Sequence, residues 1–355
     1  MTTRIPEGES AIVTFPGSAA TPSYSQIDDI EERGGHAVLS GWMFHADGPF
    51  DAVAVRNEVA EVWDATSHPR HDLPEAFPTM PHSVSGGFEA TVPLEAFRDG
   101  DRFVFTLIGI RGDATVARRR VEYQRVAEDD RPLPPEALML RAAGTDRTRP
   151  FLVKGALHAA DLTRPLSLVC QTDEVKRFFE WGCGCGWLTR HLARQLDARP
   201  SGIDLDGESI EWMASSFGEG DFSVAPPGPP VSHEDGTFDV AFALSLFEHL
   251  DAPSQLGWLA EMHRILRPSG VLVVGTFGTH AARLAPDDAI LAGLAERGIH
   301  VGTAPTGEPA HRFDGSTFVA PDAVEQLWGT SSFHITASLE AAFDGVKDLH
   351  VLQKR

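Results

Sequence analysis

Three glycines behind a carboxylate give the clearest chemical signal in this sequence. The segment Glu180-Trp-Gly-Cys-Gly-Cys-Gly186 follows a short apolar run, Val175 to Phe179, and precedes a helix-like stretch from Trp187 to Leu196. A glycine turn between a strand and its helix lets a ligand approach the backbone closely, and nucleotide cofactors bind at such turns. The candidate cofactor-binding glycines are Gly182, Gly184 and Gly186.

The spacing of these glycines distinguishes between two classes of cofactor. A dinucleotide fingerprint has glycines at positions 1, 3 and 6, whereas here they stand at positions 1, 3 and 5, and bulky Trp187 occupies the sixth. A pyrophosphate would also lie beside the Glu180 carboxylate, where like charges repel. S-adenosylmethionine has no phosphate, and its ammonium group can bind a carboxylate. The loop therefore favours S-adenosylmethionine, with Glu180 as one of its contacts.

A second carboxylate, Asp204, stands near the end of the next strand-like run, Ser201 to Leu205. A carboxylate here can accept hydrogen bonds from both ribose hydroxyls, and Leu205 would then lie against one face of the adenine. The alternative is that Asp204 only caps the following helix. Because the glycine loop already indicates a nucleoside, we favour ribose binding.

The three cysteines indicate whether the chain binds a metal and whether it is found in a reducing or an oxidising compartment. Cys183 and Cys185 lie inside the glycine loop and Cys170 stands apart, so no second cysteine pair completes a zinc site. We interpret the two loop cysteines as small, space-limited side chains rather than redox groups, and include Cys183 among the cofactor contacts. A reduced, cytoplasmic setting fits this cysteine usage.

The elements around the loop must place it at the edge of a sheet. Beyond the loop, strand-like and helix-like runs alternate, which predicts an α/β fold with a doubly wound parallel sheet and a ligand crevice at the carboxyl ends of its strands. Ser254 is the expected N-cap of the last helix, with an inner stripe that includes Leu256 and His263. The expected strands are Val175–Phe179, Ser201–Leu205, Phe222–Ala225, Phe238–Leu244 and Val271–Thr276, and the helices are Trp187–Leu196, Glu208–Phe217 and Ser254–Leu266.

Composition divides the chain into four segments. Residues 1–26 are rich in small and turn-forming residues and are expected to form a flexible tail. Residues 27–126 contain short β-type runs separated by Gly, Pro and Asp, which predicts a small all-β sandwich. A proline-rich linker over residues 127–136 precedes the α/β domain, residues 137–355. The β-type runs are His36–Phe44, Ala52–Val55, Phe88–Val92, Arg102–Ile110 and Ala117–Tyr123.

Composition also excludes several kinds of partner. With 51 acidic against 30 basic residues the net charge is −21, which repels the phosphates of nucleic acids. An Asn-Pro-Pro-aromatic motif for methylating nucleic-acid amino groups is absent, because Asn57 is the only asparagine. No apolar run approaches the roughly 20 residues of a membrane span, and the N-terminus lacks a secretory pattern. We therefore expect a cytoplasmic protein that neither binds nucleic acid nor spans a membrane.

From Glu180 to Gly278 the sequence resembles the class I S-adenosylmethionine-dependent methyltransferases, in particular a bacterial group whose loop reads GCGCG. The likeness extends from about Leu138 to the end of the chain. It implies a Rossmann-like sheet of seven strands, S-adenosylmethionine as cofactor and methyl transfer as the reaction. The matching segments are Glu180-Trp-Gly-Cys-Gly-Cys-Gly186, Gly202-Ile-Asp-Leu-Asp206, Pro226-Pro227, Phe238-Asp-Val240, Ser245-Leu-Phe-Glu-His-Leu250, Trp258-Leu-Ala-Glu261, Arg264-Ile-Leu-Arg-Pro-Ser-Gly270 and Lys347-Asp-Leu-His-Val-Leu-Gln-Lys354.

The resemblance also implies which residues contact the cofactor. Three positions depart from the group, which commonly has Arg at Trp187, Thr at Glu248 and an acidic residue within the segment Val224-Ala-Pro-Pro227. Adenine contacts from that last segment are therefore expected from its backbone. Carried over to the matching positions, the cofactor contacts fall on Glu180, Gly182, Gly184, Gly186, Asp204 and Leu205, with Leu244 and Ser245 near the methionine end.

Residues 27–126 more loosely resemble sandwich modules attached to bacterial enzymes of surface-polysaccharide synthesis. The resemblance implies a saccharide or cell-surface glycan precursor as acceptor and an association with glycan-synthesis enzymes. The module carries no catalytic motif. Its matching segments are Gly41-Trp42, Phe50-Asp-Ala-Val-Ala-Val55, Arg70-His-Asp-Leu73, Ala76-Phe-Pro78 and Gly87-Phe88.

Methyl transfer to an oxygen acceptor calls for a base. The displacement itself needs mainly alignment and exclusion of water, but an acceptor hydroxyl must lose its proton. His249 is the first candidate and Glu248 the alternative; a histidine bonded to backbone at a helix start is the competing interpretation of His249. His280, and His311 with Asp314, could also line the acceptor side, but a surface position is the favoured interpretation of each.

Two other functions remain open at this point. The chain can be a non-catalytic scaffold that keeps the cofactor fold within a glycan-synthesis complex. It can also be a small-molecule methyltransferase of secondary metabolism, whose acceptor does not involve the N-terminal module.

Overall fold

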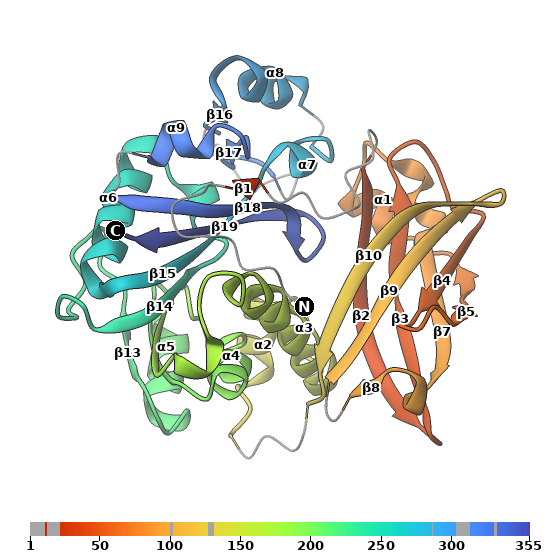
Figure 1. The fold of residues 1–355 in the computed structure, drawn as a ribbon, viewed down its shortest axis with the longest axis horizontal. Coiled ribbons are helices and arrows are strands. Elements are labelled where there is room, and N and C mark those ends of the chain that lie inside the picture. Colours follow the sequence, from red (N-terminus) through yellow and green to blue (C-terminus); the bar gives the residue numbers. More distant parts are fainter. Residues whose placement is uncertain are drawn as a thin grey trace.

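Two architectures follow one another along the chain, an all-β region up to residue 126 and an α/β region after it (Figure 1). The computed structural model describes residues 11–12, 22–99, 102–126, 131–285, 287–302, 313–329 and 332–355. His311, one of the acceptor-side candidates, lies outside the described residues. Within these ranges no helix combines the length and the apolar character that crossing a membrane requires.

The β region consists of two antiparallel sheets that share one core. Along β7 (Gly87–Pro93), buried Phe88, Ala90 and Val92 alternate with exposed residues, so one face of the strand faces that core. Each β-type run expected from the sequence lies in one of these strands. One sheet contains β2 (Ser23–Arg33), β3 (His36–His45), β7 and β6 (Thr66–His68), in that order; the other contains β10 (Ala114–Gln124), β9 (Arg102–Arg111), β4 (Ala52–Arg56) and β5 (Val62–Asp64), with β8 (Arg98–Asp99) paired to β9. Among the described residues of this region, short helices also connect the strands: α1 (Leu73–Ala76), η1 (Pro81–Gly86) and η2 (Leu94–Ala96).

Of the tail expected over residues 1–26, residues 1–10 and 13–21 lie outside the described part, and two of the described segments are strands. β1 (Ala11–Ile12) pairs in parallel with β18 (Phe333–Phe343), a strand of the α/β region, and β2 already begins at Ser23. An edge strand presents unpaired backbone groups, and β1 supplies partners for those of β18. Local composition does not reveal this pairing, because the partner strand is far away in the sequence.

An eight-stranded mixed sheet forms the centre of the described α/β region, one strand more than the seven expected, because β1 adds an edge strand. The strand order is β1-β18-β19-β15-β14-β11-β12-β13. Strands β11 to β15 pair in parallel, whereas β19 is antiparallel to both of its neighbours. The chain order reverses between β11 and β14, and ligands bind at the carboxyl ends of strands at such a switch point. The strands are β11 (Arg177–Trp181), β12 (Arg199–Asp204), β13 (Asp221–Val224), β14 (Phe238–Ala243), β15 (Leu266–Thr276), β18 and β19 (Lys347–Lys354).

Helices pack on both faces of this sheet. Along β14, Val240 lies in one apolar core with Leu192 of α4, whereas Ala241 lies in another with Leu259 of α6. Helix α2 begins at Glu136, where the expected linker ends; residues 127–130 of that linker lie outside the described part. The remaining elements are α2 (Glu136–Ala143), α3 (Thr148–Leu166), η3 (Thr172–Glu174), α4 (Thr189–Leu196), α5 (Gly207–Ser216), η4 (Phe247–His249), α6 (Ala252–Ile265), α7 (Thr279–Ala282), α8 (Asp288–Arg297), β16 (Ile299–His300), β17 (Phe318–Val319) and α9 (Val324–Trp328).

The β region packs directly against the α/β region along two surfaces (Figure 1). At one, the Tyr24 hydroxyl donates a hydrogen bond to the backbone oxygen of His280 at 3.1 Å, and the two rings lie 4.5 Å apart. At the other, Arg119 of β10 forms an ion pair with Asp161 of α3 at 3.7 Å, and Val153 of α3 joins the core of the β region. The two regions are therefore joined by shared apolar cores and not only by the linker between them.

Candidate active site

Each glycine of the loop has a backbone conformation that other residues rarely adopt. The φ angle is +84° at Gly182, +50° at Gly184 and +79° at Gly186. In this left-handed region a side chain costs roughly 1–2 kcal/mol per residue. Gly186 is restricted by space as well, since an added Cβ would lie 2.6 Å from the Met213 sulfur. The turn itself therefore demands glycine at all three positions.

Asp204 ends β12 directly below the loop. Its Oδ2 accepts a hydrogen bond from the backbone N–H of Gly184 at 2.8 Å, and its Oδ1 accepts one from Asp206 at 2.8 Å. The N-cap of α5 is Asp206, whose carboxylate accepts from the N–H of Glu208. The helix-capping alternative for Asp204 is therefore wrong. Each carboxylate oxygen has a further lone pair, so the anchored Asp204 can also accept from ligand hydroxyls.

Two large apolar side chains are exposed beside Asp204. Leu205 is 74% exposed and Val224 is 55% exposed, and Val224 is the strand partner of Asp204 across β12 and β13. Only backbone contacts are expected from the sequence around Val224, but the structure adds an apolar side chain there. Exposed apolar groups gathered at one point indicate a surface that a ligand covers.

Glu180 lies inside the protein beneath the loop, with only 3% of its surface exposed. Burial raises the pKa of Glu180 to about 8; the charge of Asp204 adds to this shift, and a hydrogen bond from Thr189 opposes it. That bond joins Thr189 Oγ1 to Glu180 Oε2 at 2.6 Å. A bound ammonium group would favour the ionised carboxylate. Sequence reasoning does not identify Thr189, because no motif marks the residue at which α4 meets β11.

The segment after β14 lies beside the glycine loop. An added Cβ on Gly182 would come 3.2 Å from Leu246 Cδ1, so this segment packs against the loop. Ser245 is exposed with a φ of +55°, whereas Leu244 is buried. A positive φ outside glycine is uncommon, and such residues cluster at functional sites. Of the two residues predicted near the methionine end, only Ser245 is open to solvent.

Lys347, at the start of β19, reaches into the same segment. Its Nζ donates hydrogen bonds to Glu248 Oε1 at 2.7 Å and to Ser245 Oγ, and lies 4.9 Å from the centre of the Phe277 ring. Lys347 and Glu248 are both buried, and Glu248 Oε2 has no hydrogen-bond partner among the described residues. Sequence reasoning misses Lys347 because its partner lies 99 residues away. Glu248 is therefore held in an ion pair on one of its two oxygens.

Buried polar contacts hold the segment in place from behind. Gln255 Nε2 donates hydrogen bonds to the backbone oxygens of Phe247, at 3.1 Å, and Leu250, at 3.3 Å. The Trp328 indole N–H in turn donates to Gln255 Oε1 at 2.9 Å. Helices α6 and α9 thus fix η4 at the edge of the sheet, and with it the candidate base His249.

His249, the first candidate base, is exposed at the end of η4. Its backbone N–H donates to the carbonyl of Leu246 at 2.9 Å, and its imidazole has no hydrogen-bond partner within the described ranges. The ring is thus accessible from solvent at the rim of the candidate crevice. His249 also lies close in sequence to Ser245, which adjoins the glycine loop.

The other acceptor-side candidates lie in different surroundings. His280 is buried against Tyr24 of the β region, and burial lowers its pKa to about 4. It therefore belongs to the contact between the two regions, and the favoured surface position is wrong for His280. Asp314 is exposed in the segment before β17.

The loop cysteines are buried thiols. Burial raises the pKa of Cys185 to about 12 and that of Cys183 well above its ordinary value, so both stay protonated near neutral pH. Cys183 packs closely on the next strand, because an added Cβ on Gly202 would lie 2.8 Å from its Cβ. Among the described residues, no group of three or more His, Cys, Asp or Glu is arranged to hold a metal ion.

Comparison with protein families identifies the central part of the chain. Residues 178–270 match a family model described as "Methyltransferase domain". The matched range contains β11, the glycine loop, Asp204 and the segment around Ser245. The sequence resemblance to S-adenosylmethionine-dependent methyltransferases is confirmed for this range.

Curated relatives match over a part of their length. A malonyl-[acyl-carrier protein] O-methyltransferase of Halalkalibacterium halodurans is 30% identical over 115 residues, which cover 30% of this chain and 41% of the relative. The cyclopropane-fatty-acyl-phospholipid synthase of Escherichia coli is 26% identical, with 34% and 32% covered. The chloroplastic tocopherol O-methyltransferase of Arabidopsis thaliana is 23% identical, with 41% of each covered. The chain thus spans less than half the length of these relatives.

The solved structures to which this chain is similar include two methyltransferases. One is a SAM-dependent methyltransferase from Methanosarcina mazei, with a TM-score of 0.42 and 19% identity, covering 54% of this chain and 96% of that one. Another is human N-acetylserotonin methyltransferase in complex with SAM, with a TM-score of 0.40 and 12% identity, covering 62% and 60%.

Proposed function

From the premise that residues 178–270 are a methyltransferase domain of the S-adenosylmethionine-dependent class, we propose that the chain transfers the methyl group of this cofactor to an oxygen acceptor. The observation that carries the proposal is the Asp204 carboxylate, anchored on the Gly184 N–H and flanked by exposed Leu205 and Val224. A nucleoside without phosphate suits these groups. Asp204 would accept hydrogen bonds from its ribose hydroxyls, Leu205 and Val224 would contact its adenine, and Glu180 would attract its ammonium group.

The proposed cofactor contacts surround the switch point between β11 and β14. The loop supplies backbone close to the cofactor, and Ser245 bounds its methionine end. The full set is Glu180, Gly182, Cys183, Gly184, Gly186, Asp204, Leu205, Leu244 and Ser245.

The residues around Ser245 have the task of aligning the acceptor and taking its proton. When bound, S-adenosylmethionine supplies an electrophilic methyl carbon on a sulfonium centre. His249 would accept the proton of the acceptor hydroxyl as the oxygen–carbon bond forms and the carbon–sulfur bond of the cofactor breaks, because its imidazole is exposed and has no hydrogen-bond partner within the described ranges. The buried pair of Glu248 and Lys347 acts by positioning, since it fixes the backbone that carries His249.

A saccharide or cell-surface glycan precursor is the proposed acceptor. The N-terminal region resembles modules of surface-polysaccharide enzymes, and it packs directly on the methyltransferase region through Tyr24 and Arg119. Two of the named relatives are O-methyltransferases, which supports oxygen as the methylated atom. A malonyl thioester is the second candidate acceptor, because the first of these relatives acts on malonyl-[acyl-carrier protein] and is 30% identical over the matched residues.

Incubation of the full chain with methyl-labelled S-adenosylmethionine tests the proposal. The acceptor panel contains nucleotide sugars, oligosaccharides and a malonyl thioester, and mass spectrometry locates the label. Label on a saccharide oxygen supports the proposal. Label on the malonyl carboxylate alone would show that the acceptor is a malonyl thioester and not a saccharide. Titration calorimetry with S-adenosylmethionine, S-adenosylhomocysteine and NAD tests the cofactor; heat with NAD only would overturn the assignment.

The scaffold alternative gives a different result in the same experiment. Cofactor binding without transfer to any acceptor, together with an unchanged result for His249→Gln, would favour a non-catalytic role in a glycan-synthesis complex. A methyltransferase of secondary metabolism would instead methylate a small molecule without any need for the β region.

A further inference from the structure

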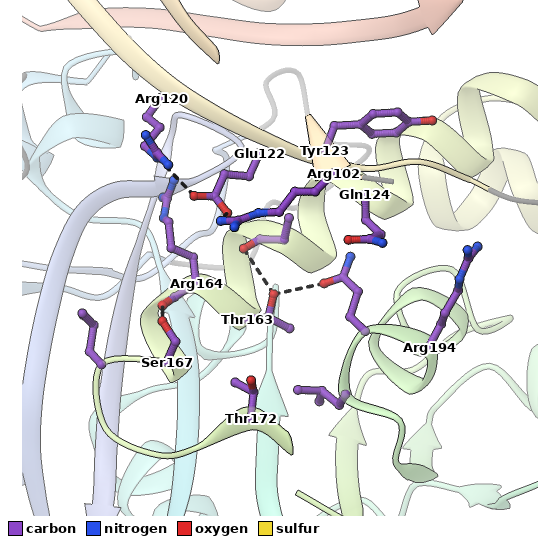
Figure 2. A pocket seen from close by; sticks show the side chains of 14 residues that line it. Arg102, Arg120, Glu122, Tyr123, Gln124, Thr163, Arg164, Ser167, Thr172 and Arg194 are labelled. Carbon is purple, nitrogen blue, oxygen red and sulfur yellow. Dashed lines mark hydrogen bonds and ion pairs between the residues drawn. The ribbon is translucent and has the colours of Figure 1, made fainter. Parts of the chain in front are cut away.

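The β region and the α/β region meet where β10 packs on α3. A pocket of about 720 Å³ lies there, lined by Arg120 from the strand and Thr163 from the helix (Figure 2). Close to them in the sequence, Arg119 and Asp161 form an ion pair between the regions, with Nη2 and Oδ2 3.7 Å apart. Arg119 Nη1 also donates a hydrogen bond to the backbone oxygen of Ser25 in β2. Arg119 therefore joins both sheets of the β region to α3.

The turn between β18 and β19, residues 344–346, is bound to the same ion pair. The backbone N–H of Asp344 donates to Asp161 Oδ2 at 3.2 Å, so this oxygen faces both the turn and Arg119. The Asp344 carboxylate accepts from the backbone N–H of Lys347 at 3.4 Å. Hydrogen bonds thus connect the ion pair between the regions to the first residue of β19.

The β18–β19 turn also packs directly on the β region. An added Cβ on Gly345 would lie 2.7 Å from the backbone oxygen of Ser25 and 2.9 Å from Arg119 Nη1, so no side chain fits at this position. Val346 is buried in an apolar core that contains Tyr24. Protein interiors are close-packed, so a shift of the β region at this contact would displace the turn.

Lys347 follows the turn and extends this contact into the candidate active site. Its ammonium donates hydrogen bonds to Glu248 Oε1 at 2.7 Å and to Ser245 Oγ. Ser245 has a φ of +55°, a strained conformation that persists only where the surrounding structure holds it. The conformation of Ser245, a proposed cofactor contact, therefore depends on where the turn places Lys347.

We propose that the β region takes part in the methyltransferase reaction by positioning Lys347. Arg119 is the positioning residue: it holds the β18–β19 turn, and the turn holds Lys347 beside Ser245. Without the Arg119 guanidinium, Gly345 loses a group on which it packs, and Asp161 loses the positive charge that faces it. The inference rests on the proposed function, because it assigns the β region a role in cofactor binding at that same site.

Hydrogen exchange of the free full chain tests this coupling without any ligand. The variant R119M removes the guanidinium. Its matched control is R149M, because Arg149 of α3 also pairs with the β region, through Asp29 and Glu31 of β2. We expect the amides of residues 245–250 to exchange at least about threefold faster in R119M than in the wild type, with those of α5 unchanged. R149M should leave both segments unchanged.

A second pair of variants leaves the ion pair in place. Gly345 and Gly112 both lie in turns between strands, with φ angles of +75° and +55°. G345A brings a Cβ against Ser25 and Arg119, whereas the Cβ of G112A lies in open space. We therefore expect residues 245–250 to exchange faster in G345A and at the wild-type rate in G112A.

Cofactor affinity tests whether the coupling passes through Lys347. By calorimetry, we expect R119M to bind S-adenosylmethionine at least about threefold more weakly than the wild type. In the E248Q/K347M background R119M should have no further effect, because the link to Ser245 is already broken. A wild type that binds no S-adenosylmethionine would refute the proposed function, and the exchange experiment alone would then decide this inference.

Three results would overturn the proposal. The first is wild-type exchange of residues 245–250 in both R119M and G345A. The second is equally accelerated exchange in α5, which would mean that the variants only destabilise the fold. The third is the same loss of cofactor affinity on adding R119M to E248Q/K347M as on adding it to the wild type. Melting curves show whether each variant is folded, and G345A serves alone if R119M is not.

Discussion

The Lys347 ammonium lies 2.7 Å from the Glu248 carboxylate, although the two residues are 99 positions apart in the chain. Both are buried, and the same ammonium binds Ser245 beside the glycine loop. The pair thus joins β19 to the segment that bears the candidate base. A buried ion pair that loses one partner leaves an uncompensated charge in the interior.

Removing either partner should therefore destabilise the fold. We predict that Lys347→Met and Glu248→Gln each lower the free energy of unfolding by about 3–5 kcal/mol. The double variant E248Q/K347M should lose less than the sum, because it leaves no unpaired charge. Urea denaturation at pH 7 measures all four proteins. Single variants as stable as the wild type would show that the pair is not buried.

Asp204 should decide cofactor affinity. In Asp204→Asn, an amide group replaces one carboxylate oxygen, so one of the backbone N–H groups of Gly184 and Asp206 loses its acceptor and the ribose hydroxyls lose acceptors too. We predict at least about tenfold weaker binding of S-adenosylmethionine. Asp206→Asn is the matched control, since asparagine caps helices as well as aspartate does. Calorimetry that shows equal affinity for both variants would refute ribose binding by Asp204.

Gly186 should tolerate alanine less well than a glycine of similar backbone conformation. Gly144 has a φ of +67° and open space where a Cβ would lie, whereas Gly186 has a φ of +79° and the Met213 sulfur 2.6 Å away. We predict a loss of about 1 kcal/mol for Gly144→Ala and about 2–4 kcal/mol for Gly186→Ala. Chemical denaturation measures both values. Equal losses would mean that backbone strain alone demands the glycine.

Glu180 should give the fold a distinct pH dependence. Its folded pKa of about 8 lies above its unfolded value of roughly 4.3, so between these values the folded chain holds a proton that the unfolded chain has lost. Stability from this group is therefore present at low pH and lost as the pH rises through 8. We predict that the wild type loses at least about 1 kcal/mol relative to Glu180→Gln between pH 5.5 and 8.5.

The exposed Glu211 provides the control for this pH measurement. Urea denaturation of Glu211→Gln should follow the pH profile of the wild type. If the pH profile of Glu180→Gln ran parallel to that of the wild type, the raised pKa of Glu180 would be contradicted. The comparison with the wild type cancels the contributions of the buried histidines, which titrate in all three proteins.

The α/β region should not fold alone. Residues Val153, Ala156 and Leu157 of α3 lie in the core of the β region, and Phe277 packs in a core shared with Trp42. A fragment of residues 131–355 would expose these side chains to water. We predict aggregation or a melting temperature far below that of the full chain, measured by circular dichroism. A soluble fragment with full methyl transfer would favour the small-molecule alternative of secondary metabolism.

Elements with a strong local pattern are predictable from this sequence. The five parallel strands lie close to their expected positions, because each is a short apolar run after a turn. Helix α6 shows the limit: it begins at Ala252 with Asp251 as N-cap, whose carboxylate accepts from the N–H of Ser254, the expected cap. The buried stripe shifts accordingly, so that Trp258 is buried where the sequence favours Leu256.

The candidate site likewise contains residues that the sequence predicts and residues that it does not. Asp204 and the glycine loop lie on consecutive elements, and the sequence predicts their meeting. The sequence does not predict that Lys347 belongs to the site, because its contact with Glu248 forms only when β19 takes its place in the sheet. His280 is misjudged for a related reason, since its burial comes from Tyr24 of the other region.

The pairing of β1 with β18 sets an order of events during protein synthesis. Ala11 pairs opposite Ala337, so β1 leaves the ribosome long before its partner strand has been translated. Domains generally fold as units, those nearer the N-terminus first. The β region can therefore assemble early. Strand β1 can pair only after β18 of the eight-stranded sheet has been made.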